Sequence, residues 1–122
     1  MMNLSISNSS DLPLYRQLYD QIAGSIIRGD ISSGSPLPPI RTVATELKIS
    51  VISVKRAWEE LERDGFIDTA VGRGCFVREL SAQDISYLRG MMIQERIKSD
   101  VAYAKSLGVS FEEFTKIIKS LF

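Results

Sequence analysis

The side chains of this 122-residue chain that could do chemistry are cations, carboxylates and small hydroxyls, because histidine is absent and Cys75 is the single cysteine. One cysteine cannot form an internal disulfide. Without histidine, a Cys/His zinc site or a Ser-His or Cys-His nucleophile pair is excluded. The carboxylates gather in the run 59–64, which we interpret as a solvated helix face because no concave site encloses it. We therefore expect neither an enzyme nor a metal or cofactor site.

Cations stand at three places where they could meet a polyanion. Arg41 opens one predicted helix, Lys55 and Arg56 lie near the start of the next, and Arg73 stands in a glycine-rich turn. The formal net charge is +0, from 15 basic and 15 acidic residues, and no third of the chain is strongly basic. Any affinity for nucleic acid must therefore come from the placement of a few cations.

The elements that must position these cations follow from hydrophobic spacing and capping residues. Residues 1–11 are polar and predict a flexible arm. A first helix is expected from about Asp11, as its cap, to Gly29. A short second helix is expected over residues 39–48, and a third from the cap Ser50 to about residue 64.

A hairpin is expected to follow the third helix. Residues 66–69 and 75–77 have strand-like composition around Gly72-Arg73-Gly74. Trp58 lies on the apolar stripe of the third helix and is interpreted as a core residue. Two helices joined by a short turn and followed by a hairpin are typical of a winged helix-turn-helix, here over residues 12–78.

Residues 79–122 predict a separate helical tail. A long helix is expected over residues 81–107, and a last helix over 110–122, opened by a capping box of Ser110 and Glu113. The last helix is marginal alone in water, so its apolar side chains must pack against something. The fold class expected for the whole chain is α+β, mainly helical, with an N-terminal winged helix-turn-helix and a short two-helix tail.

Several short motifs stand in order between Pro13 and Val77. They are Pro13-Leu14-Tyr15, Gly29, Gly34, Leu37-Pro38-Pro39-Ile40-Arg41, the stretch 54–65 (VKRAWEELERDG), Gly72-Arg73-Gly74 and Phe76-Val77. In this order and spacing they resemble the DNA-binding domain of GntR-family transcription regulators. The short tail looks like that of the YtrA-like subfamily, in which two C-terminal helices serve for dimerisation. The resemblance implies a bacterial homodimer that binds a palindromic operator, and regulation of an ABC-transporter operon.

The resemblance also implies which residues touch DNA. Arg41 matches the arginine of the family's Leu-Pro-Ser-x-Arg motif, in which Pro39 here replaces the serine. The start of the third helix is expected in the major groove and the hairpin tip in or beside the minor groove. The DNA contacts so implied are Arg41, Ser50, Ile52, Ser53, Lys55, Arg56, Gly72, Arg73 and Gly74.

These assignments have alternatives. Val51 stands where the family usually has an arginine, so guanine readout is not expected there, and Ile52 can touch a thymine methyl instead. Arg41, Lys55 and Arg56 could be solvated surface side chains, and the Gly-Arg-Gly tip could be a plain hairpin turn. Cys75 is interpreted as a structural thiol, since no partner cysteine is available to it.

The tail is implied to form the dimer. It is too short to enclose a ligand pocket of the usual ~300 Å³ within one chain, so a small-molecule effector stays unassigned, although one could bind at the dimer seam. The residues expected to pack between subunits are Leu88, Met91, Met92, Ile97, Phe111, Phe114 and Ile118.

We therefore expect a sequence-specific DNA-binding transcriptional regulator, a repressor more than an activator, that acts as a homodimer on a palindromic operator. The alternative is a winged-helix module that binds protein and not DNA. A fused enzyme domain would need several hundred further residues. The N-terminus has no basic flank or apolar segment typical of a secretory signal, and no apolar run reaches ~20 residues. We thus expect a cytoplasmic protein with no membrane partner.

Overall fold

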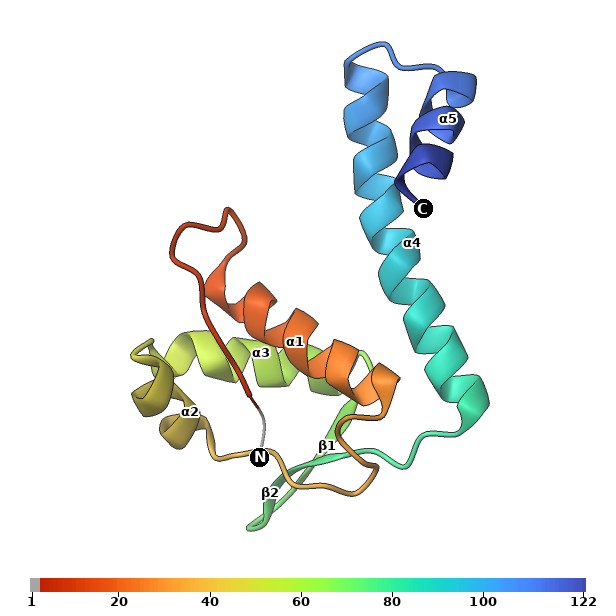
Figure 1. Ribbon diagram of the computed structural model, residues 1–122. Coiled ribbons are helices and arrows are strands. Elements are labelled where there is room, and N and C mark those ends of the chain that lie inside the picture. The colour runs from red at the N-terminus through yellow and green to blue at the C-terminus, as the bar shows by residue number, and fades with distance from the viewer. Residues whose placement is uncertain (1–2) are drawn as a thin grey trace. The chain divides into compact units, whose positions relative to one another are not determined.

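The computed structural model describes residues 3–122 and divides into two compact units, one that ends at Ser81 and one that spans Ala82–Phe122. The first unit holds three helices followed by an antiparallel two-stranded hairpin, and the second holds two helices (Figure 1). This confirms the predicted α+β, mainly helical class. Within residues 3–122, no helix is long and apolar enough to cross a membrane.

Helix α1 (Leu14–Arg28) begins two residues after the position that its predicted cap, Asp11, would require. The prediction that Asp11 caps it is wrong, because Pro13 occupies the N-cap position and no side chain makes a cap hydrogen bond there. The other end is as predicted. Gly29 adopts a left-handed φ of 83°, and its N–H donates to the Ile26 carbonyl at 3.2 Å.

The residues before α1 are tied to it by two glutamines. The backbone of Ser7 exchanges hydrogen bonds of 2.9 and 3.0 Å with the Gln17 amide, and the backbone of Ser5 exchanges bonds of 3.0 and 2.6 Å with the Gln21 amide. Gln17 and Gln21 are one turn apart, so their side chains share one face of α1. The segment expected to be a flexible arm is thus paired with α1 at two points.

Helices α2 (Ile40–Leu47) and α3 (Val51–Arg63) form the helix-turn-helix. The predicted second helix, 39–48, is correct to within one residue at each end, since Pro39 and Lys48 take the two cap positions. Ser50 caps α3 as predicted, because its Oγ accepts the N–H of Ser53 at 3.1 Å. Helices α2 and α3 therefore frame a short, locally specified turn.

The core of the first unit lies where one face of α3 meets α1 and the hairpin. Leu18 and Ile22 of α1 and Val54 of α3 are fully buried, and so is Phe66 at the start of the hairpin. Trp58 is 3% exposed, which confirms its prediction as a core residue. Burial of this stripe fixes which side of α3 faces solvent.

Strands β1 (Ile67–Ala70) and β2 (Gly74–Val77) pair antiparallel, one residue away from the predicted ranges. The strand β2 has a second neighbour that was not predicted. Three backbone hydrogen bonds of 2.8–2.9 Å join residues 34–37, in the connector before α2, to Cys75 and Val77. The hairpin is therefore held on both sides of β2, which ties it to the start of the helix-turn-helix.

The second unit consists of α4 (Ala82–Ser106) and α5 (Phe111–Leu121), and the chain reverses direction between them (Figure 1). The 25 residues of α4 span roughly 38 Å at ~1.5 Å each. Ser110 caps α5 as predicted, since its Oγ accepts the N–H of Glu113 at 3.1 Å. None of the residues of α5 is buried, so much of the surface of its apolar side chains stays in contact with solvent in a single chain.

Lys48 is the one non-glycine residue of the described chain with a positive φ, 57°. Because a side chain is disfavoured in that conformation, we expect Lys48→Gly to raise the free energy of unfolding by about 0.5–1 kcal/mol. Urea unfolding followed by the fluorescence of Trp58, the single tryptophan, measures this in the first unit. The control Glu46→Gly, inside α2, should lower it by about 0.5–1 kcal/mol; a loss in both variants would contradict the prediction.

Candidate nucleic-acid interface

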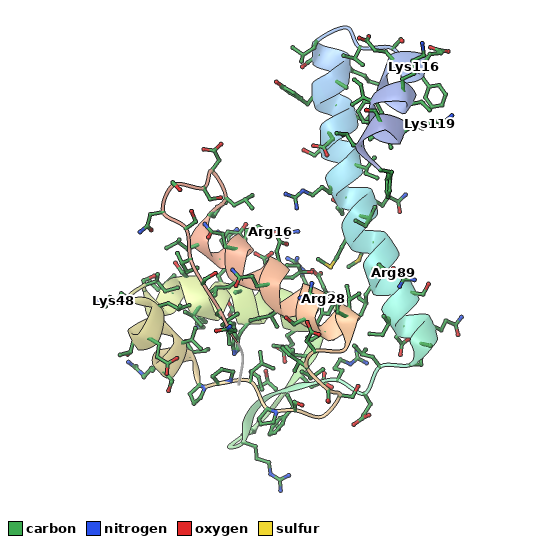
Figure 2. All side chains as sticks on the ribbon, viewed as in Figure 1. Arg16, Arg28, Lys48, Arg89, Lys116 and Lys119 are labelled. Atoms are coloured by element: carbon green, nitrogen blue, oxygen red, sulfur yellow. The ribbon has the colours of Figure 1, made fainter. Side chains whose placement is uncertain are left out.

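The turn of the helix-turn-helix is held by its own backbone. The N–H of Lys48 donates to the Thr45 carbonyl at 3.3 Å, and the N–H of Ile49 donates to the Ala44 carbonyl at 3.0 Å. Lys48 lies at the end of α2 nearest α3, and its side chain is exposed (Figure 2). Lys48 was not among the predicted contacts, although its place two residues before the α3 cap could have signalled it.

The first turn of α3 presents two aliphatic side chains to solvent. Ile52 is 78% exposed and Val51 is 37% exposed. The serines beside them are engaged in the cap, since Ser50 Oγ accepts the Ser53 N–H and donates to Ser53 Oγ, both at 3.1 Å. The predicted contacts Ser50, Ile52 and Ser53 therefore lie together at the helix N-terminus, but the hydroxyls serve the helix itself.

The predicted cation Arg56 is held within the first unit. Its guanidinium stacks on the Tyr15 ring at 3.8 Å from the centroid, and Nη2 donates to the Tyr15 hydroxyl at 3.2 Å. Its Nε donates to Glu60 at 3.2 Å. Arg56 thus links α3 to α1. Because Tyr15 is 41 positions away, no local spacing could have predicted the pair.

Four of the cations in the first unit make no ion pair within residues 3–122, whereas five others do. The five paired arginines include Arg56 and Arg78, which lies 3.6 Å from Asp68. All four of the unpaired cations are exposed, and three of them were predicted to contact DNA. The four are Arg41, Lys48, Lys55 and Arg73.

The prediction that the carboxylates near the end of α3 form a solvated face holds for the exposed Glu62 but is wrong for Glu60 and Asp64, which are half-buried. Glu62 accepts the backbone N–H of Thr69 at 3.1 Å, and Glu60 pairs with two arginines. Asp64 accepts the hydroxyl of Tyr19. Burial, together with this hydrogen bond, raises the pKa of Tyr19 above its ordinary value.

The hairpin tip is shaped by its glycines. Gly72 and Gly74 have φ of 78° and 91°, a left-handed conformation that a side chain resists. Between them Arg73 is exposed, and its N–H donates to the Ala70 carbonyl at 2.9 Å, which closes the turn. Val71 is 101% exposed beside it. The predicted Gly-Arg-Gly tip is therefore an ordered turn that leaves a guanidinium free for a partner.

Comparison with known proteins identifies the chain. Residues 14–77, more than half of it, match the model described as "Bacterial regulatory proteins, gntR family". The chain belongs to the GntR family. The predicted resemblance is thereby confirmed, and with it a transcription regulator with a DNA-binding winged helix.

Relatives of this GntR-family chain match it along most of its length. It is 32% identical over 111 residues to the HTH-type transcriptional regulator YhcF of Bacillus subtilis (strain 168), with 91% of each chain covered. It is 30% identical over 118 residues to the HTH-type transcriptional repressor YtrA of the same organism, covering 97% of this chain and 91% of that one. These relatives are transcriptional regulators and not enzymes, which is consistent with the expectation of no enzymatic activity.

Solved structures agree with the fold. A transcriptional antiterminator from Listeria monocytogenes EGD-e has a TM-score of 0.74 at 26% identity and covers 98% of this chain and 90% of its own. YtrA from Sulfolobus acidocaldarius, a GntR-family transcription factor, has a TM-score of 0.64 at 26% identity and covers 97% and 95%. The likeness to YtrA in both comparisons confirms the resemblance to YtrA-like regulators.

The contacts of Arg56 predict a stability role that Lys55, its neighbour, lacks. We expect Arg56→Ala to lower the free energy of unfolding by about 1 kcal/mol, the sum of an exposed cation–π contact and a helical ion pair. Lys55→Ala should change it by less than about 0.5 kcal/mol. Urea unfolding followed by Trp58 fluorescence measures both.

A double-mutant cycle assigns the effect of Arg56 to its partner. Tyr15→Ala combined with Arg56→Ala should cost at least about 0.5 kcal/mol less than the two single changes together, because each single change already breaks the stack. Strict additivity would show that Arg56 does not act through Tyr15.

Proposed function

We propose that the protein is a homodimeric repressor that binds a palindromic operator, with α3 of each subunit in the major groove and the hairpin tip against the minor groove. The observation that carries this proposal is the group of unpaired, exposed cations in the first unit: Arg41 and Lys48 on α2 and its turn, Lys55 on α3 and Arg73 at the tip. They lie on the elements with which a winged helix-turn-helix meets DNA. On α3, in contrast, Glu60 pairs with arginines and Glu62 accepts a backbone N–H.

Dimerisation explains how a chain of zero net charge can bind a polyanion. Two subunits bring two sets of cations to one duplex, with recognition helices about 34 Å apart, one turn of B-DNA. If each of the four cations neutralises one phosphate, a dimer contacts about eight phosphates. The electrostatic attraction then comes from their position and not from overall charge.

The second unit supplies the surface for dimerisation in this proposal. Several of its apolar side chains are exposed: Phe111 by 79%, Ile97 by 44% and Ile118 by 38%. Met91, Met92 and Phe114 are half-buried, and Leu88 is buried. Exposed apolar surface of this kind on a monomer is typical of an interface, and pairing two copies would bury it.

The target genes follow from the family likeness alone. The similarity to YtrA-like regulators supports an ABC-transporter operon as the regulated unit, with repression by occlusion of the promoter. No effector is assigned, since α4 and α5 are too few elements to enclose a ligand within one chain. Footprinting on the promoter of its own gene is the direct test of operator binding.

The salt dependence of operator binding measures the number of phosphate contacts. For a dimer with about eight contacts, log K should fall against log salt with a slope near −7. Arg73→Ala should reduce the slope to about −5, because it removes one contact from each subunit. Fluorescence anisotropy with the footprinted operator measures both slopes.

Arg78 offers a matched control on the same hairpin. It is paired with Asp68 at 3.6 Å, so Arg78→Ala should leave the slope unchanged. Charge reversal of Lys55 and Arg73 together should abolish binding. Binding that survives this reversal, or that does not depend on salt, would contradict the proposal and favour the module that binds protein.

The dimer depends on the apolar face of α5. Ile118→Glu should convert the protein to monomers at micromolar concentration and weaken operator binding, because it places a charge in the buried seam. Ser120→Glu adds the same charge outside the apolar face and should leave the dimer intact. Sedimentation velocity measures both, and a wild-type monomer that binds the operator equally well would overturn the dimer model.

A further inference from the structure

The first turn of α3 carries an aliphatic pair, Val51 and Ile52, of which Ile52 is largely exposed to solvent. Ile52 is 78% exposed and Val51 is 37% exposed. Val54 and Trp58 of the core follow Val51 by three and seven positions, so Val51 flanks the core, whereas Ile52 lies away from it. Both exposed residues are β-branched, which slightly disfavours a helix. Packing therefore gives no reason for an aliphatic side chain as exposed as Ile52.

The polar groups around the pair are mostly engaged within the protein. Ser50 and Ser53 bond to each other through their hydroxyls at 3.1 Å, and the cap takes the Ser53 N–H. Arg56 is held by Glu60 and the Tyr15 ring. Lys55 is exposed and makes no ion pair within residues 3–122. The surface that α3 offers to a base edge is thus aliphatic, with one lysine a turn further along.

Lys55 shares a helix face with both aliphatic residues. It follows Val51 by four positions and Ile52 by three, and residues at these spacings are neighbours on a helix. A DNA duplex that meets Lys55 with its phosphates or a guanine edge therefore brings base edges close to the pair. Lys55 supplies the attraction to DNA, and the aliphatic side chains face the base edges within the groove.

One apolar group is available on the base edges of the major groove, the C5-methyl of thymine. The other base edges present hydrogen-bond donors and acceptors there, which Val51 and Ile52 cannot satisfy and would desolvate at a cost. We infer that α3 reads thymine methyls through Val51 and Ile52, so that each operator half-site carries thymines beneath the first turn of α3. This inference rests on the proposed function and specifies the class of operator.

Replacement of thymine by deoxyuridine tests the inference, because uracil pairs with adenine in the same way and lacks only the methyl. Each thymine of the footprinted operator is replaced in turn, and the Kd is measured by fluorescence anisotropy. We expect the replacement to weaken binding about fourfold at one or two positions per half-site, because each replacement removes one methyl group that is buried against the protein. Replacement in both half-sites should weaken it about fifteenfold.

Ile52→Ala identifies the residue that reads the methyl. In this variant the ratio of Kd for uracil and thymine at one of the sensitive positions should fall to about one. Val71→Ala is the matched control, since Val71 is also an exposed aliphatic residue but lies at the hairpin tip; it should leave the ratio unchanged. Ile52 is exposed, so thermal melting of the variant should match the wild type.

A third DNA retains the methyl but changes the base pair. With 5-methylcytosine opposite guanine at a sensitive position, binding should be tighter than with plain cytosine, because the methyl occupies the same place in the groove. The inference is overturned if the footprint is present but no uracil substitution weakens binding, or if Ile52→Ala preserves the uracil effect at every position. Absence of any footprint would instead contradict the proposed function.

Discussion

Burial of one stripe of α3 against α1 and the hairpin fixes the rotation of that helix about its axis. Val54 and Trp58 face inward, and a helix turns about 100° per residue, so Ile52 and Lys55 have to face solvent. A slip of one residue would bury Lys55 and expose core side chains. The surface that the protein can present to DNA is thus set by its hydrophobic core before any charge is considered.

Internal pairing decides which charges remain for a partner. Arg56 and Arg63 both lie at Glu60, within 3.2–3.5 Å, and Arg63 also pairs with Asp64. These contacts sit at the surface and contribute little to stability individually. Even with these pairs the C-terminal half of α3 holds more carboxylates than cations, whereas Lys55, near the N-terminus, makes no ion pair within residues 3–122. A zero net charge therefore hides an uneven surface.

Local signals were predictable from sequence and distant ones were not. The caps Ser50 and Ser110 and the terminator Gly29 were found because each acts within a few residues of itself. The stack of Arg56 on Tyr15 joins positions 41 apart, and the bonds of the connector to β2 join positions as far apart along the chain. Such pairs are created by the tertiary fold, and no periodic spacing in the sequence indicates them. All the candidate cations but Lys48 were therefore identified, but not which of them the fold engages.

The few free cations and the aliphatic first turn of α3 complement each other. Attraction to phosphates is the same for every sequence and weakens steeply as salt rises, whereas a contact with a thymine methyl depends on neither ionic strength nor charge. A protein with many cations would bind non-operator DNA strongly without gaining discrimination, because the phosphate attraction cancels in the ratio of operator to non-operator affinity. With about four cations in each subunit, non-specific binding stays weak. Contacts of modest strength with thymine methyls can then decide which sites on the genome the dimer occupies.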